Sequence, residues 1–315
     1  MANVTDAAFR FIIAKYGKPD VMWTEFVSAD GLCSKGKDRL LPDLWFDQSE
    51  RPIVAQIFSA DPKKIAKASR LIKKLGFDGL DINMGCPDKG VERQGAGAAL
   101  IKNPALAQKI ILTAKKNAHP LPVSVKTRIG YNQDSLNEWL PALLETEPAV
   151  ITVHARTRKE MSKVPARWDT VSTAVKIRDQ LSSRKKTLIF GNGDIKNLKE
   201  AKLKAKETGA DGIMIGRGIF GNPWFFNSKI NPEKIKPENK LKVLLEHTYR
   251  FENQLSRIKR FEIMKKHFKA YVNGWDGAKE LRLELMEAQN TDEIQKIIKS
   301  NFPKIKLEAN LKKLL

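Results

Sequence analysis

Short apolar runs of strand type alternate with amphipathic segments of helical spacing from residue 21 to residue 217. Clusters of glycine, proline and polar residues bound these apolar runs, as is typical of buried strands. The segment 61–75 shows the helical pattern, because its apolar positions fall on one face and Asp61 is placed to cap the helix. The strands predicted in this way are residues 21–27, 52–58, 79–83, 123–128, 150–155, 187–194 and 212–217.

Strict alternation of strand and helix predicts a parallel sheet. We therefore predict the α/β class and a TIM (β/α)8 barrel, which needs eight strands. The first strand is expected to be missing, because the chain opens on a helix that Thr5 would cap and that carries Phe9, Ile12 and Ile13. Met1 would then be an internal methionine of a longer native chain. A doubly wound open sheet is the alternative, although no Gly-x-Gly-x-x-Gly turn follows an early strand.

The pattern changes after residue 228, where strand-type runs stop and lysine-rich helical segments follow. We predict a small C-terminal all-helical domain whose apolar positions pack together and whose basic positions face outward. The predicted domains are a catalytic barrel over residues 1–228 and a helical domain over residues 229–315. The predicted helices of the second domain are residues 240–255, 259–272, 278–288 and 292–300.

The formal net charge of +21 favours a polyanionic partner such as nucleic acid, although a lysine-rich solvated surface is the plainer explanation. Cys33 and Cys86 match no metal-ligand spacing and no disulfide framework, so neither a metal nor a disulfide is expected. No apolar run is long enough for a membrane span, and the first residues lack the features of a signal peptide. We expect a cytoplasmic protein with no membrane partner.

Candidate chemistry begins at Cys86, which directly follows a predicted buried strand and is held in a turn containing Gly85 and Pro87. The alternative is a small buried apolar residue, which is how many lone cysteines behave. The polar residues Gln56, Asn83, Lys126 and His154 stand near the ends of four different strands, where barrel enzymes place their catalytic groups.

Glycine-rich turns end the last two predicted strands, at residues 191–194 and 216–218. Such turns expose backbone N–H groups, and Arg217 adds a fixed positive charge, so the pair suits a phosphate group. In a complete barrel these strands would be the seventh and eighth, after which barrels commonly bind the phosphate of a cofactor.

These residues together resemble the tRNA-dihydrouridine synthases, which are flavoproteins. The resemblance spans the predicted barrel, and the helical tail is similar in kind. The motifs that carry it are Ala2-Asn3-Val4-Thr5-Asp6 with Phe9-Arg10, Thr24-Glu25, Gln56-Ile57-Phe58, residues 81–87 with Gly95-Ala96-Gly97-Ala98, Val125-Lys126-Thr127-Arg128, His154-Ala155-Arg156-Thr157, residues 191–195 and residues 211–224.

The resemblance implies an FMN site in the barrel mouth. Gln56 and Lys126 would hydrogen-bond the flavin ring, and His154 would lie near it. The phosphate end of the cofactor would be held by Asn192, Gly193, Asp194, Gly216 and Arg217. Met1 and Ala2 are what remains of the family's Ala-Pro-Met segment and would belong to the same site. Ser59 departs from the family, where glycine is common, and we expect a minor effect.

The resemblance also implies a reaction. NADPH would reduce FMN, the flavin would deliver hydride to C6 of a uracil in tRNA, and Cys86 would protonate C5 as general acid. A thiol is suitable, because its unperturbed pKa near 8.5 leaves it mostly protonated at neutral pH. Asn83 and Arg128 would contact the uridine, and the helical domain would grip the tRNA. The protein is expected to be a monomer.

Two rival functions remain open at this point. One is an FMN barrel reductase that acts on a free pyrimidine, which the basic helical tail argues against. The other is a non-catalytic RNA-binding protein on the same fold, which the presence of Cys86, Lys126 and His154 argues against.

Overall fold

The computed structural model describes residues 1–181 and 187–306, which form two compact units. The sheet unit contains Val21–Leu44 and Arg51–Gly218. The helical unit contains Met1–Asp20, Trp45–Glu50 and the chain from Ile219 onward. The two units are described separately below.

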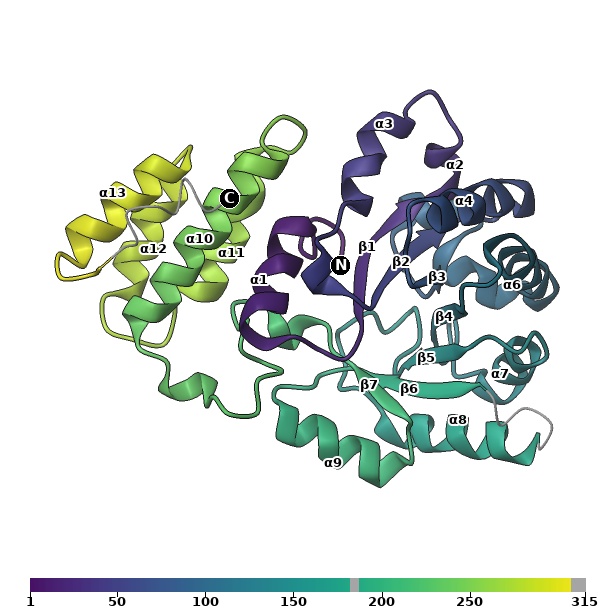
Figure 1. Ribbon diagram of the computed structural model, residues 1–315. Helices are drawn as coiled ribbons and strands as arrows, with labels where there is room; N and C mark the ends of the chain where they lie inside the picture. The colour runs from purple at the N-terminus through teal and green to yellow at the C-terminus, as the bar shows by residue number, and fades with distance from the viewer. Residues whose placement is uncertain (182–186, 307–315) are drawn as a thin grey trace. The chain divides into compact units, whose positions relative to one another are not determined.

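The sheet unit is built on seven parallel strands that lie side by side in chain order (Figure 1). This order, with each strand beside the next one in sequence, is that of a (β/α)8 barrel with one strand fewer. The predicted fold class is therefore confirmed. The strands are β1 (Met22–Ser28), β2 (Ile53–Phe58), β3 (Gly79–Met84), β4 (Val123–Arg128), β5 (Val150–His154), β6 (Leu188–Asn192) and β7 (Gly212–Met214).

Helices connect the strands of this unit, as the alternating pattern predicts. The longer ones are α4 (Pro62–Lys74), α6 (Pro104–Ala118), α7 (Leu136–Leu144), α8 (Trp168–Gln180) and α9 (Leu198–Thr208). Short helical turns are α2 (Ala29–Leu32), α3 (Lys37–Leu40), α5 (Lys89–Arg93), η1 (Leu41–Leu44), η3 (Gly97–Lys102) and η5 (Arg217–Ile219), the last of which begins in this unit.

Helix α4 shows how local sequence sets an element. The Asp61 carboxylate accepts a hydrogen bond from the backbone N–H of Lys63 at 2.7 Å and so caps the helix. Ile65 and Ile72 are fully buried at helical spacing. Leu75 differs from the prediction, because it lies beyond the last helical residue and is exposed. The buried face of α4 therefore ends at Ile72, about one turn before the end that the apolar pattern predicts.

Strand β4 separates its side chains between two faces. Thr127 accepts a hydrogen bond from the indole N–H of Trp139 on α7 at 2.9 Å, so its side chain points toward the helices. Because successive side chains of a strand alternate, Lys126 and Arg128 point to the opposite face of the sheet. That face carries the polar residues of the candidate site.

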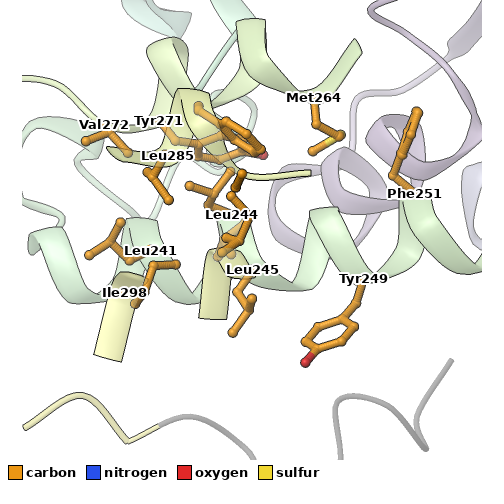
Figure 2. Packing of buried hydrophobic residues seen from close by; sticks show 14 of the residues in the cluster. Leu241, Leu244, Leu245, Tyr249, Phe251, Met264, Tyr271, Val272, Leu285 and Ile298 are labelled. Atoms are coloured by element: carbon orange, nitrogen blue, oxygen red, sulfur yellow. The ribbon is translucent and has the colours of Figure 1, made fainter. Parts of the chain in front are cut away.

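The helical unit consists of α1 (Ala7–Gly17), η2 (Gln48–Glu50), η6 (Pro232–Lys234), α10 (Pro237–Leu255), η7 (Phe261–Met264), α11 (Lys265–Tyr271), α12 (Ala278–Glu287) and α13 (Thr291–Asn301). Aliphatic and aromatic side chains of α10 to α13 form one apolar core (Figure 2), as the helical pattern predicts. Leu244, Phe268 and Leu285 in this core are fully buried. Burial of each such side chain contributes roughly 1.5–3 kcal/mol.

Helix α1 packs against α10 and so belongs to the helical unit. Its N-cap is Asp6, whose carboxylate accepts from the N–H of Phe9 at 3.0 Å. The predicted cap, Thr5, is wrong, because its hydroxyl instead accepts a hydrogen bond from the amino group of Met1 at 2.7 Å. The predicted domain boundary between residues 228 and 229 stays a prediction, and residues 307–315 of the predicted second domain lie outside the described residues.

Candidate functional site

The sheet register brings the predicted site residues together. Asn83 on β3 is the partner of Lys126 on β4. Arg128 on β4 is the partner of His154 on β5, which is in turn the partner of Asn192 on β6. Because all strands are parallel, these positions lie at the same edge of the sheet. Residues from four strands thus meet at the carboxyl ends of β3 to β6.

A buried hydrogen-bond network links β2, β3 and β4 below this edge. The side-chain amide of Gln56 donates to Asp81 Oδ2 at 2.7 Å, and its Oε1 accepts from Asn83 Nδ2 at 3.0 Å. The Ser124 hydroxyl donates to the other oxygen of Asp81. Burial raises the pKa of Asp81 to about 6, although the bonds from Ser124 and Gln56 oppose the shift. The network fixes the position of the Gln56 amide.

Asn83 also shapes the turn that carries Cys86. Its Oδ1 accepts from the backbone N–H of Gly85 at 3.1 Å and from that of Cys86 at 2.9 Å. On the far side of the turn, the N–H of Ala98 donates to the Cys86 carbonyl at 2.9 Å. A Cβ at Gly97 would lie 2.7 Å from that carbonyl oxygen, and Gly97 has a φ of +61°. The glycine is therefore required for the close approach.

The Cys86 side chain is half-buried and packs against Phe58, Val91 and Ala96. Burial raises the pKa of the Cys86 thiol above its ordinary value. Lys126 and Arg128 lie close enough to oppose that shift through their charge, and the Asp88 backbone N–H opposes it further. The net effect keeps the thiol protonated at neutral pH.

Lys126 is half-buried, and in the described part of the chain its amine makes neither a hydrogen bond nor an ion pair. Burial lowers the pKa of Lys126 to about 8, and the nearby Arg128 charge adds to the effect, whereas Asp81 opposes it. A partly buried ammonium group without a partner is costly, so the position suits a ligand with a negative or electron-rich edge.

Arg128 supports the cysteine turn. Its Nε donates to the Gly85 carbonyl at 2.8 Å, and its Nη1 donates to the carbonyls of Thr157 at 3.0 Å and Met161 at 3.1 Å. Burial lowers the pKa of Arg128 to about 10, so the group remains charged. The side chain therefore joins the turn after β3 to the segment after β5.

A charged cluster closes the other side of the site. Arg156 lies 3.1 Å from His154 Nε2 through its Nη1 and pairs with Asp194 through its Nη2. Arg217 donates to the other oxygen of Asp194 at 2.8 Å. Burial lowers the pKa of His154 far below its ordinary value, and Lys126, Arg128, Arg156 and Arg217 add to the shift. His154 is therefore neutral at physiological pH.

Two glycines beside this cluster differ in the space around them, since Gly193 is closely packed and Gly216 is open. Gly193 has a φ of +140°, and a Cβ there would lie 2.6 Å from the Cβ of Ala166. A Cβ at Gly216 would meet nothing within 4 Å. Asn192 ties the two turns together, because its side-chain amide donates to the Met214 carbonyl at 2.8 Å. The open backbone at Gly216 beside Arg217 is the geometry that a phosphate requires.

Residues 1–310 match a family model described as dihydrouridine synthase (Dus). The chain belongs to the dihydrouridine synthase family. The resemblance inferred from the motifs is therefore confirmed, and so is the predicted class of enzyme, an oxidoreductase that converts uridine to dihydrouridine.

Two relatives cover nearly the whole chain. The "Probable tRNA-dihydrouridine synthase 2" of Bacillus subtilis (strain 168) is 40% identical over 301 residues, which are 95% of this chain and 91% of the relative. The "Probable tRNA-dihydrouridine synthase" of Staphylococcus aureus (strain COL) is 38% identical over 301 residues, 95% of this chain and 90% of the relative.

Two supporting residues of the site were not predicted from the sequence. Asp81 stands in the strand motif, but only the structure shows its bonds to Gln56 and Ser124. Arg156 belongs to the sequence motif after β5, two residues beyond His154. Its place in that motif was the sequence signal that could have identified it. Met1 and Ala2 lie in the helical unit, and their part in a cofactor site stays a prediction.

The described residues include no group of three histidine, cysteine, aspartate or glutamate side chains placed to hold a metal ion. Across residues 1–181 and 187–306, none of the helices combines the length and apolar character needed to cross a bilayer.

Proposed function

We propose that this protein is a tRNA-dihydrouridine synthase that reduces the C5–C6 double bond of specific uridines in tRNA, with FMN as cofactor and NADPH as reductant. The observation that carries the proposal is the protonated Cys86 thiol, which an Asn83-capped turn places at the strand ends with Lys126 and Arg128 nearby. Membership of the dihydrouridine synthase family and the tRNA substrate in its relatives' names support it.

The residues at the strand ends fit FMN. Lys126 has an amine without a partner in the described chain, and a flavin ring would supply an electron-rich edge for it. Gln56 would bind the ring through the amide that Asp81 and Asn83 position. Arg217 and the glycine turns at Gly193 and Gly216 would bind the phosphate end. When bound and reduced by NADPH, FMN would supply the hydride that adds to C6.

Cys86 completes the reaction as general acid. Hydride addition at C6 leaves negative charge on C5 and O4 of the uracil, so a proton must be delivered to C5. Cys86 holds that proton on Sγ, because burial raises the pKa of the thiol. Asn83 fixes the position of the thiol by accepting from the Cys86 N–H, and Arg128 holds the same turn through the Gly85 carbonyl.

The tRNA partner is consistent with the charge of the chain. A net charge of +21 supports binding of the phosphate backbone. The target uridine must leave the RNA stack to reach the strand ends, at a cost of a few kcal/mol that phosphate contacts offset. We also propose that the enzyme is a monomer, that it is cytoplasmic and that it uses no metal ion.

The test is mass spectrometry of unmodified tRNA after incubation with the protein, FMN and NADPH. A gain of two hydrogens at one uridine, located by fragment mapping, is the expected result. Free uracil and orotate serve as comparison substrates. Reduction of a free pyrimidine without reduction of tRNA would identify a different barrel reductase, and RNA binding without any reduction would indicate a non-catalytic protein.

A further inference from the structure

The helical unit contains a hollow that the proposed reaction does not use. Its walls come from residues 45–50 and from the C-terminal end of α10 with the residues that follow it. The volume is about 660 Å³, within the range of small-ligand sites. The lining side chains that carry the argument are Trp45, Asp47, Arg250, Asn253, Gln254 and Arg257.

Arg250 is the reason to expect a ligand. The residue is only 9% exposed, and its guanidinium lies over the ring of Phe11 at 3.2 Å from the centroid. Its Nε donates to no acceptor, and the nearest carboxylate oxygen, on Asp47, is 3.7 Å from Nη2, beyond hydrogen-bond distance. A guanidinium has five N–H donors, and buried donors without acceptors are costly. Burial without such bonds also lowers the pKa of Arg250.

The hollow also offers acceptors. The side-chain oxygen of Gln254 is buried and accepts from no donor. Asp47 presents a carboxylate that is 42% exposed. Donors and acceptors therefore face the same space, and a ligand with both on one edge would satisfy them. Trp45 adds an indole that is 49% exposed and lines the same hollow.

The charges in the hollow argue against a simple anion. Arg250 and Arg257 are balanced by Asp47 and Glu50. Glu50 also forms an ion pair with Arg10, whose Nε donates to the Glu50 carboxylate at 2.6 Å. A free phosphate would meet the exposed Asp47 carboxylate, whereas an uncharged planar group would meet an aromatic face, arginine donors and carboxylate or amide acceptors.

We propose that this hollow binds an unpaired nucleobase of the tRNA substrate, distinct from the uridine that is reduced, and that guanine fits it best. The N7 and O6 of guanine accept from arginine, as they do in DNA recognition. Its N1–H and N2–H2 groups donate to acceptors of the type that Asp47 and Gln254 supply. The base stacks on Trp45, which is the common way in which proteins hold unstacked bases of RNA. This inference rests on the proposed function, because tRNA is the source of the base.

The hollow is preformed by buried contacts. Arg10 is 2% exposed, and it donates to Glu50, to the Thr5 carbonyl at 2.7 Å and to the Trp45 carbonyl. The backbone N–H of Asp47 donates to Glu50 at 2.8 Å. The segment that carries Trp45 and Asp47 is thus fixed before any base arrives, which reduces the entropy lost on binding.

The test measures binding of unmodified tRNA to the full-length protein carrying Trp45→Ala or Gln254→Ala. Loss of one stacked base lowers affinity about tenfold or more, so we expect this loss for Trp45→Ala and a smaller loss for Gln254→Ala. The slope of affinity against salt concentration stays unchanged, because neither residue contacts phosphate. Leu283→Ala is the matched control, since Leu283 is 62% exposed on α12, outside the hollow, and should bind tRNA normally.

A photo-crosslink identifies the base. With 6-thioguanosine in the tRNA, irradiation should join the RNA to peptides that contain residues 45–50 or 253–258. Wild-type affinity in both variants, or crosslinks only elsewhere, would overturn the base site while leaving reduction of the target uridine intact. If the wild-type protein neither binds nor reduces tRNA, the proposed function fails first and the base site fails with it.

Discussion

Two buried clusters of polar side chains, one in the sheet unit and one in the helical unit, differ in whether their atoms are hydrogen-bonded. In the sheet unit, Gln56, Asp81 and Asn83 are buried and hydrogen-bonded to one another. In the helical unit, His247 and His267 are fully buried, and none of their ring nitrogens has a hydrogen-bond partner. The hydrogen bonds of the sheet unit hold Gln56 and Asn83 in position for binding, whereas the two histidine rings of the helical unit pack in the core without hydrogen bonds.

The histidine pair belongs to an aromatic cluster. The ring centroids of His247 and His267 are 4.6 Å apart, and Phe9 lies 5.5 Å from the first and 5.2 Å from the second. Burial lowers the pKa of His247 to about 3 and that of His267 well below its ordinary value. Both rings are therefore neutral in the folded protein, and their protonation opposes folding. The two clusters show that burial of polar atoms alone does not distinguish a binding site from packing.

The sharpest test of the sheet unit is Cys86→Ala. Loss of a general acid lowers the rate roughly 100-fold to 10,000-fold, so we expect most tRNA reduction to disappear while FMN stays bound. Turnover is measured as dihydrouridine formed, and bound flavin by absorbance. Cys33→Ala is the control, since Cys33 is also half-buried but belongs to another segment, and it should keep full activity. Undiminished turnover by Cys86→Ala would remove the general-acid role.

The helical unit is tested by pH. The folded-state pKa of His247 lies below the ordinary value of about 6.5. Between the folded-state pKa of about 3 and the ordinary pKa of about 6.5, the unfolded chain binds a proton at His247 that the folded protein does not. The free energy of unfolding therefore falls as pH drops below about 6.5. The loss is on the order of 2 kcal/mol at about pH 5.

His247→Leu should remove this loss. We expect hydrogen exchange in α10 and α11 to become faster in the wild type at about pH 5 than at neutral pH, and to change less in the variant. His119→Leu is the control variant, because His119 is exposed and belongs to the sheet unit. An equal acid response in wild type and His247→Leu would show that the buried ring does not set it.

Asp81→Asn tests whether the connected network matters for the cofactor. The change removes an acceptor from either Gln56 or Ser124, and a lost buried hydrogen bond costs about 1–3 kcal/mol. We expect FMN affinity, measured by fluorescence titration, to fall about tenfold, because Gln56 loses its fixed position. Ser124→Ala should have a smaller effect.

Asp81 also gives the opposite pH dependence to the histidines. Its folded-state pKa of about 6 lies above the ordinary aspartate value, so the folded protein binds the proton more tightly. Its contribution to stability therefore falls as pH rises from about 4 to 6. Asp81→Asn should remove this fall, and an unchanged slope would contradict the raised pKa.

The smallest expected effect concerns the ion pair between Glu92 and Arg158. Glu92 follows the cysteine turn on α5, and Arg158 Nε donates to its two oxygens at 2.8 and 2.9 Å. Glu92→Gln should weaken this link by about 1 kcal/mol and lower kcat a few-fold without loss of FMN. Glu207→Gln breaks an exposed pair with Lys204 on α9 and should change neither quantity. Equal effects of the two variants would remove any positioning role for Glu92.

Much of the fold follows from local sequence. The strands and the helices between them were predicted within a few residues, because apolar periodicity is a property of neighbouring positions. The same is true of the Cys86 turn, since Asn83 acts on the backbone of Gly85 and Cys86 only a few residues away. The Thr5 cap was wrong because Asp6, one residue later, competes for the same helix end.

What the sequence determined by itself is therefore the order of strands and helices and the residues that stand at the strand ends. The tertiary structure decided how those residues are used: Asp81 bonds Gln56 25 positions away, and Arg128 bonds Gly85 43 positions away. It also decided that Arg250 meets Trp45 and Asp47 in one hollow and that His247 meets His267. These pairings depend on chain segments that are distant in sequence, and no periodicity or local propensity encodes such contacts.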